Sequence, residues 1–370
     1  MSYYILPKIN SQIVINPSKT HIHDLQTYIS HSLLQYVNAI KKQIDYLILN
    51  ANDLSLNEIV KSVNPCEYIF SKIPGSKYSV SKLKPDSNVF YEFLEICNTF
   101  NIFEIYENIS INSLHISENK NDSIECFEML RENYEDNITS YNNFSIKEIE
   151  MLNEKFEILV FEKPSMSLKN YFTYLASCML TILKCQIKNG SCVIKIDNAC
   201  YKPVIDLMYF LSSLYDKVYI LKPNSSNITT FEKYIICKNY QCKTDFTNIN
   251  YHTLKSFVEN NDDNNDNNDD NNNVISAFLD YATPYYFLSK IEDINVIIGY
   301  QQIESLDLIS NIVKNKNRED KIETLKKTNI TKAISWCEKY KIPCNKFAER
   351  VNIFLPLANK EKEENVVMTV

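Results

Sequence analysis

The sequence predicts an α/β protein whose mostly parallel sheet ends in an antiparallel hairpin at one edge. Three observations lead to this fold class. Between residues 76 and 240 short apolar runs alternate with amphipathic stretches, the order typical of parallel strands covered by helices on both faces. The run FEILVFE at 156–162 is apolar between charged neighbours, as buried parallel strands are. The last two strands, 217–222 and 234–238, are joined by a linker too short for a crossover helix, so they should pair antiparallel.

The individual elements follow from their periodicity. Apolar residues at helical spacing indicate the helices, and Pro203 suits the first turn of the last of them. Short apolar runs bounded by polar residues indicate the strands. We expect helices at 90–100, 123–133, 168–188 and 202–215, and strands at 111–117, 156–162, 191–196, 217–222 and 234–238.

Both flanks of this region predict added helices. At 24–49 apolar residues recur at helical spacing, and Asp24 is a candidate N-cap. Residues 260–273 are only Asn and Asp, with no apolar side chain to bury, which predicts a disordered linker. From 274 the pattern returns to helices. The predicted division is an N-terminal helical extension (1–75), the α/β domain (76–245), the linker (259–273), a C-terminal helical region (274–358) and a tail (359–370).

Composition and charge exclude several function classes. The 370 residues carry a net charge of −7, which argues against bulk electrostatic capture of nucleic acid. The 11 cysteines include no CxxC pair and no spacing typical of a metal site, so we expect buried, reduced thiols and no bound metal. We see no signal peptide and no apolar run long enough for a membrane span. These features predict a cytoplasmic protein.

A longer motif lies near the end of the α/β region. NGSCVIKI at 189–196 is a glycine turn followed by a strand that carries Lys195, and the next strand ends in Lys-Pro at 222–223. A Ser-containing loop, Glu232-x-Tyr and a final strand follow. This order resembles that of the FtsJ-like (RrmJ-type) 2′-O-methyltransferases, most of all the mRNA cap methyltransferases of nucleocytoplasmic large DNA viruses. The resemblance covers about 150 residues and implies a Rossmann-like methyltransferase sheet; if the chain is viral, it would reside in the host cytoplasm or the virion.

The resemblance also implies a catalytic set of Lys, Asp, Lys and Glu, in which the central lysine helps to deprotonate a ribose hydroxyl. Lys195 matches the central lysine and Glu232 the glutamate. Glu92 stands where the family has its first lysine, which reverses the charge. Glu162 stands where the family has aspartate. Two of the four positions are therefore degenerate.

The position of the cofactor loop is altered further. In the family an acidic residue and two glycines after the first strand admit S-adenosylmethionine. Here Glu118 matches the acidic residue, but Asn121 and Asp122 replace the glycines. Only some 30 residues separate this loop from the strand at 156–162, so the half that would hold adenosine should be shortened. We therefore expect no cofactor; S-adenosylmethionine would bind only if the protein is active.

Three functions remain open. The first is a non-catalytic relative of cap 2′-O-methyltransferases that acts as a scaffold or regulatory subunit, with an active methyltransferase or a transcription and capping assembly as partner. The second is an active enzyme with a divergent cofactor loop that methylates capped RNA. The third is an RNA-binding protein that keeps the substrate groove, for which Lys202, Lys222 and Lys238 are candidates beside Lys195.

Overall fold

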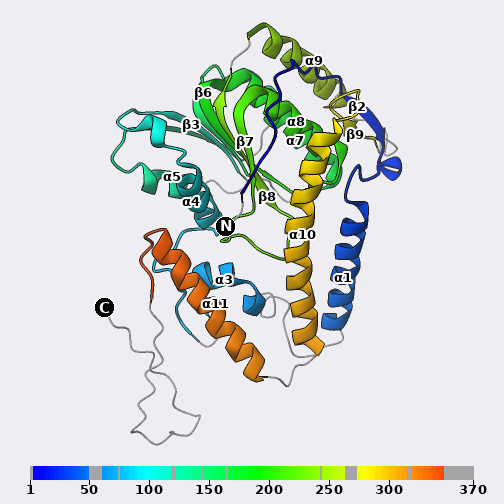
Figure 1. Ribbon diagram of the computed structural model, residues 1–370. Coiled ribbons are helices and arrows are strands. Elements are labelled where there is room, and N and C mark those ends of the chain that lie inside the picture. Colours follow the sequence, from blue (N-terminus) through cyan, green and yellow to red (C-terminus); the bar gives the residue numbers. More distant parts are fainter. Residues whose placement is uncertain are drawn as a thin grey trace, which may run out of the picture.

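A computed structural model describes residues 3–49, 61–73, 76–117, 122–142, 146–162, 166–241, 244–262, 273–314 and 319–345. Its centre is a seven-stranded mixed sheet in the order β1-β7-β8-β6-β5-β3-β4 (Figure 1). The strands are β1 (Tyr3–Ile5), β3 (Asn112–Ile116), β4 (Asn137–Tyr141), β5 (Phe156–Phe161), β6 (Gln186–Ile196), β7 (Tyr215–Leu221) and β8 (Lys233–Tyr240). The α/β fold class predicted from the sequence is confirmed.

The direction of the strands follows from their connections. Helices α5 (Ile124–Leu130), α6 (Ile146–Met151) and α7 (Leu168–Cys185) connect β3, β4, β5 and β6, which run parallel. Helix α8 (Lys202–Leu214) leads to β7. The short linker after β7 makes β8 antiparallel, and β8 inserts between β6 and β7. The hairpin is as predicted, but it does not form the edge of the sheet, because β1 pairs with β7 outside it.

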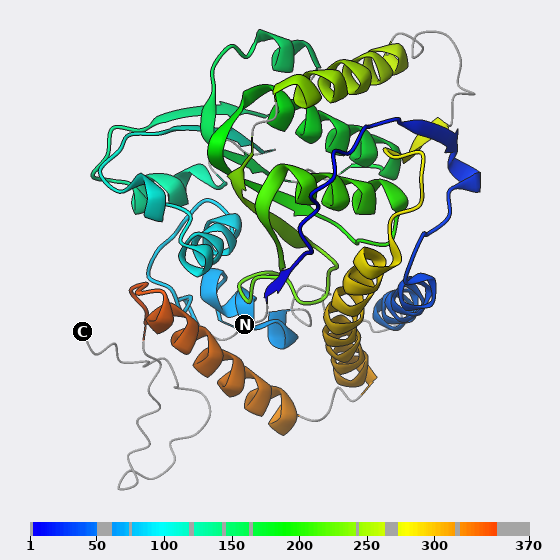
Figure 2. The same ribbon diagram turned by 45° about the horizontal axis from the view of Figure 1, so that its top comes forward.

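Helices cover both faces of the sheet. Leu159 of β5 and Ile194 of β6 pack in a core that includes α7 and α8. Val160 and Val193, which point the other way, pack against α4 (Val89–Phe100) and α5. On this second face lie also α3 (Pro65–Phe70) and α11 (Glu319–Lys339), which contact each other (Figure 2). The alternation of side chains along each strand thus builds two cores.

Two long helices form a third group beside the sheet. Helix α1 (His31–Leu49) lies along α10 (Tyr285–Lys314), and both views show the two side by side. At their crossing Gly299 faces Leu33, and a Cβ on Gly299 would come within 2.6 Å of the Leu33 side chain. A larger residue at this position would require the Leu33 side chain to shift. Residues of the β7–β8 linker, among them Phe231, join this apolar cluster.

The N-terminal segment differs from its prediction as a helical extension. Besides α1 it contains β1 of the main sheet and β2 (Ser18–His21), which pairs with β9 (Asn273–Ala277). The predicted helix start at Asp24 is wrong. Asp24 ends a short 3-10 turn (Ile22–Asp24), and α1 begins at His31. The amides of Tyr28 and Ile29 donate to the Cys200 carbonyl, which holds this stretch against the domain instead of in a helix.

The region around the Asn/Asp tract also differs. Helix α9 (Thr244–Asp262) was not predicted and extends past the expected start of the linker at 259. Its mostly polar sequence hid the spacing of eight and four residues between the buried Phe246, Leu254 and Val258. The expected helical region from 274 begins instead as strand β9 and continues as the 30-residue α10. The predicted disorder falls largely on 263–272, which lie outside the described residues, as does the tail.

The half of the sheet beyond β3 is short, as expected. Only β4 pairs with β3 on that side among the described residues, where the resemblance leads one to expect two strands. The residues of β4 are mostly polar and half-exposed, because an edge strand buries less side-chain surface than a central strand. No helix in the part of the chain that the structure describes is long and apolar enough to cross a bilayer.

Candidate functional site

The candidate residues meet at the carboxyl ends of the parallel strands. Chain connections leave β3 in one direction toward β4, and β5 in the other toward β6, so a topological switch point lies between β3 and β5. In open α/β sheets, ligands bind outside such a point. Glu162 follows β5 directly and Lys195 lies at the end of β6. The sheet topology therefore puts both side chains at the place where a binding site is expected.

Lys195 is the centre of a charged cluster. Its Nζ lies 3.1 Å from Oε2 of Glu92 and 3.8 Å from Oε2 of Glu232. Glu92 comes from α4, and its Oε2 also accepts a 2.6 Å hydrogen bond from the Tyr234 hydroxyl. Burial lowers the pKa of Lys195, but the charges of Glu92, Glu162 and Glu232 outweigh it, so the pKa lies above its ordinary value. Lys195 is consequently a paired ammonium and not a proton acceptor.

Glu162 is in the opposite situation. Its side chain is buried, and neither carboxyl oxygen has a hydrogen-bond partner among the described residues. Its pKa is raised to about 8, mainly by burial; the charge of Lys195 opposes the shift, and the nearby Glu92, Asp122 and Glu232 add to it. Near neutral pH this group is protonated and uncharged. The four positions implied by the resemblance thus lie together. Lys195 is held there as an ammonium group in an ion pair with Glu92, and Glu162 is a neutral acid.

The cofactor loop lies only partly within the described residues. Glu118 and Asn121 fall outside them. Asp122 is 6% exposed, and its Oδ1 has no hydrogen-bond partner in the described chain. In the family this position is a glycine whose missing side chain leaves room for S-adenosylmethionine. Here a buried carboxyl group stands at this position; the absence of S-adenosylmethionine stays a prediction.

Glu95, one turn beyond Glu92 on α4, anchors the β7–β8 linker. Its carboxylate accepts hydrogen bonds from the amides of Asn224 and Ser225, at 2.9 and 3.0 Å, and from the Ser225 hydroxyl. A fourth donor is Nε1 of Trp336 in α11, at 2.8 Å. Burial raises the pKa of Glu95, although these hydrogen bonds act in the opposite direction. Trp336 lies 241 residues away in sequence, and no local pattern could have identified it.

The candidate RNA-binding lysines do not form one basic surface. Lys222 is half-buried, and its Nζ donates to the carbonyls of Thr230 and Glu232; burial lowers its pKa to about 8. Lys202 pairs with Asp206 at 2.9 Å. Lys238 donates to the Phe100 carbonyl. Because β8 runs antiparallel to β6, Lys238 lies near the amino-terminal end of β6, away from Lys195. Each ammonium is thus engaged within the chain; RNA binding by these residues stays a prediction.

Comparisons with known proteins give structural neighbours only. No model of a known protein family matches the sequence, and no curated protein matches it. A putative ribosomal RNA methyltransferase from Plasmodium falciparum is similar over 42% of this chain and 97% of its own, with 16% identity and a TM-score of 0.33. Human methyltransferase-like protein 13 is similar over 50% and 93%, with 9% identity and a TM-score of 0.29. A putative hemolysin from Streptococcus thermophilus is similar over 49% and 78%, with 10% identity and a TM-score of 0.25.

These neighbours concern the fold alone, and at these scores they say nothing about activity. The site described above stands on its own geometry. The chain has an α/β fold with a seven-stranded mixed sheet, and at the carboxyl edge of that sheet it gathers Lys195, Glu92, Glu162 and Glu232.

Proposed function

We propose that this protein is a non-catalytic relative of the cap 2′-O-methyltransferases and acts as a scaffold or regulatory subunit. The observation that carries the proposal is the ion pair of Lys195 with Glu92. A lysine that helps to remove a proton needs a lowered pKa, which a neighbouring cation provides. At this position the chain has a carboxylate, which raises the pKa of Lys195 instead.

Two further observations support the proposal. Asp122 is a buried side chain at a position where the resemblance leads one to expect a glycine. The linker after β7 is held by added helices. The Ser225 hydroxyl donates to Glu95, which also accepts a hydrogen bond from Trp336 of α11, and the Thr229 carbonyl accepts a 2.7 Å hydrogen bond from Gln302 of α10. These contacts support a structural role for the linker.

Titration with S-adenosylmethionine tests the proposal directly. Calorimetry of the full chain at millimolar ligand should show no saturable heat, because Asp122 stands in place of a glycine of the cofactor loop. Incubation with capped RNA and labelled S-adenosylmethionine should transfer no methyl group to the ribose. An active FtsJ-type methyltransferase measured in parallel provides the positive control. A saturable isotherm together with 2′-O-methylated product would refute the proposal and establish an active enzyme.

Binding of capped RNA without methyl transfer would favour the third function. Such binding should weaken strongly as salt rises, because phosphate contacts release counterions. The scaffold proposal expects no such binding, since Lys202, Lys222 and Lys238 are occupied by acceptors within the chain.

A further inference from the structure

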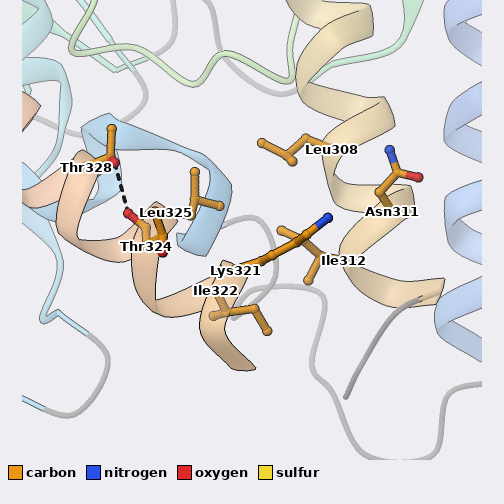
Figure 3. Close-up of a pocket in the computed structure, with 8 residues that line it drawn as sticks. All are labelled: Leu308, Asn311, Ile312, Lys321, Ile322, Thr324, Leu325 and Thr328. Atoms are coloured by element: carbon orange, nitrogen blue, oxygen red, sulfur yellow. Dashed lines mark hydrogen bonds between the residues drawn. The ribbon is translucent and has the colours of Figure 1, made fainter. Parts of the chain in front are cut away.

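An open groove lies between α10 and α11, away from the Lys195 cluster. It encloses about 550 Å³ and is lined by Leu308, Asn311, Ile312, Lys321, Ile322, Thr324, Leu325 and Thr328. In Figure 3, Leu308 points from α10 toward α11, and Lys321 reaches from α11 toward Ile312. Leu308 is 38% exposed, and Ile312, Ile322 and Leu325 are half-buried. Four aliphatic side chains thus present apolar surface that the described chain leaves open.

The groove includes a short apolar ridge on α10. Residues four apart on a helix follow one another on its surface. Leu308 and Ile312 are such a pair, and both line the groove. Ridges of this kind pack into the grooves of a second helix.

Charge indicates which helix would fit. Glu304 and Asp307 are exposed beside the apolar ridge, and neither forms an ion pair with another residue of the described ranges. The groove's own cation, Lys321, lies on the α11 side. The best-matching partner helix would therefore place an apolar stripe over the groove. Its flank toward α10 would carry Lys or Arg, and its flank toward Lys321 would carry a carboxylate.

We propose that this groove binds an amphipathic helix of a partner protein, with basic residues on the flank that faces Glu304 and Asp307. The site lies on the added helices and not at the carboxyl edge of the sheet. It supplies the surface that the scaffold role proposed above requires. Its test measures helix binding and not methyl transfer, so each proposal can fail without the other.

The experiment uses the full chain and a fluorescent 18-residue model peptide that carries a leucine stripe, lysines on one flank and glutamates on the other. Its zero net charge prevents general attraction to a chain of net charge −7. Anisotropy should show saturable binding with Kd below about 1 mM. Leu308→Asp should weaken it at least about tenfold by placing a charge on the apolar surface. Asp307→Lys should weaken it about threefold or more.

A matched control is Ile249→Asp on α9, whose side chain is 57% exposed outside the groove. This variant should bind the peptide like the wild type. The proposal is overturned if no saturable binding occurs, or if Ile249→Asp weakens binding as much as Leu308→Asp. It is also overturned if sedimentation shows a dimer of this chain that Leu308→Asp dissociates, because the groove would then bind a second copy.

Discussion

At the scale of single residues, two groups with opposite proton affinity lie at the end of the sheet. Lys195 keeps its proton because the carboxylates of Glu92 and Glu232 pair with it, and Glu162 keeps its proton because burial disfavours its charged form. Because Glu162 is uncharged, the cluster carries one negative charge fewer. The arrangement stabilises a protonated cluster, whereas a base is what proton abstraction would need.

The protonation of Glu162 makes a prediction about stability and pH. Its folded pKa of about 8 exceeds the ordinary value of 4.5, so the folded state binds a proton that the unfolded state releases between these values. The free energy of unfolding should therefore fall as pH rises from about 5 to 8. Glu162→Gln, which stays neutral, should be more stable than the wild type by roughly 2–4 kcal/mol at pH 8 and by less than about 1 kcal/mol at pH 5.

Urea denaturation at the two pH values measures this difference. Glu304→Gln, an exposed change on α10, serves as the control and should leave the dependence on pH unaltered. Equal stability of Glu162→Gln and the wild type at pH 8 would mean that Glu162 is ionised in the folded protein.

At the scale of elements, packing decided what periodicity left open. Strand β8 lies between β6 and β7, which buries it on both sides, and β1 closes the edge that the hairpin was expected to form. Helix α10 runs unbroken through Gly299 because α1 packs directly against that position. A glycine in a helix usually costs about 1 kcal/mol relative to alanine, and here close packing offsets that cost.

Gly299→Val tests this contact. The new side chain would overlap Leu33, so we expect the free energy of unfolding to fall by about 1–3 kcal/mol. Combining it with Leu33→Ala should make the loss smaller than the sum of the single changes, since the overlap is then removed. Thermal and chemical denaturation of the three variants measure the coupling. Strict additivity would show that Leu33 and residue 299 do not touch.

At the scale of the whole molecule, the added helices and the sheet share one linker. Glu95 of α4 binds the linker after β7 and Trp336 of α11 through the same carboxylate. On the other side, Gln302 of α10 binds the Thr229 carbonyl of that linker. The linker after β7 thus serves as the junction to α10 and α11.

Trp336→Phe should loosen this junction while it keeps an aromatic ring. Loss of the donor to the buried Glu95 should lower the free energy of unfolding by about 1.5–3 kcal/mol. Amide hydrogen exchange should become faster in 222–231, because Glu95 then holds the linker less firmly. Tyr300→Phe, 62% exposed on α10, is the control and should change neither quantity. Unchanged exchange in the Trp336 variant would mean that α11 does not stabilise the linker.

The sequence alone determined the α/β class, the hairpin and most elements between 90 and 240, because burial on two faces leaves a clear apolar pattern. It also identified Lys195, Glu232, Glu162 and Glu92, which the structure brings together. Polar or partly exposed elements such as β4 and α9 lack that pattern and were missed. Only the tertiary structure placed β1 at the sheet edge, joined Trp336 to Glu95 and opened the groove beside Leu308. Those contacts join residues far apart in the chain, and they depend on three-dimensional packing that no local spacing records.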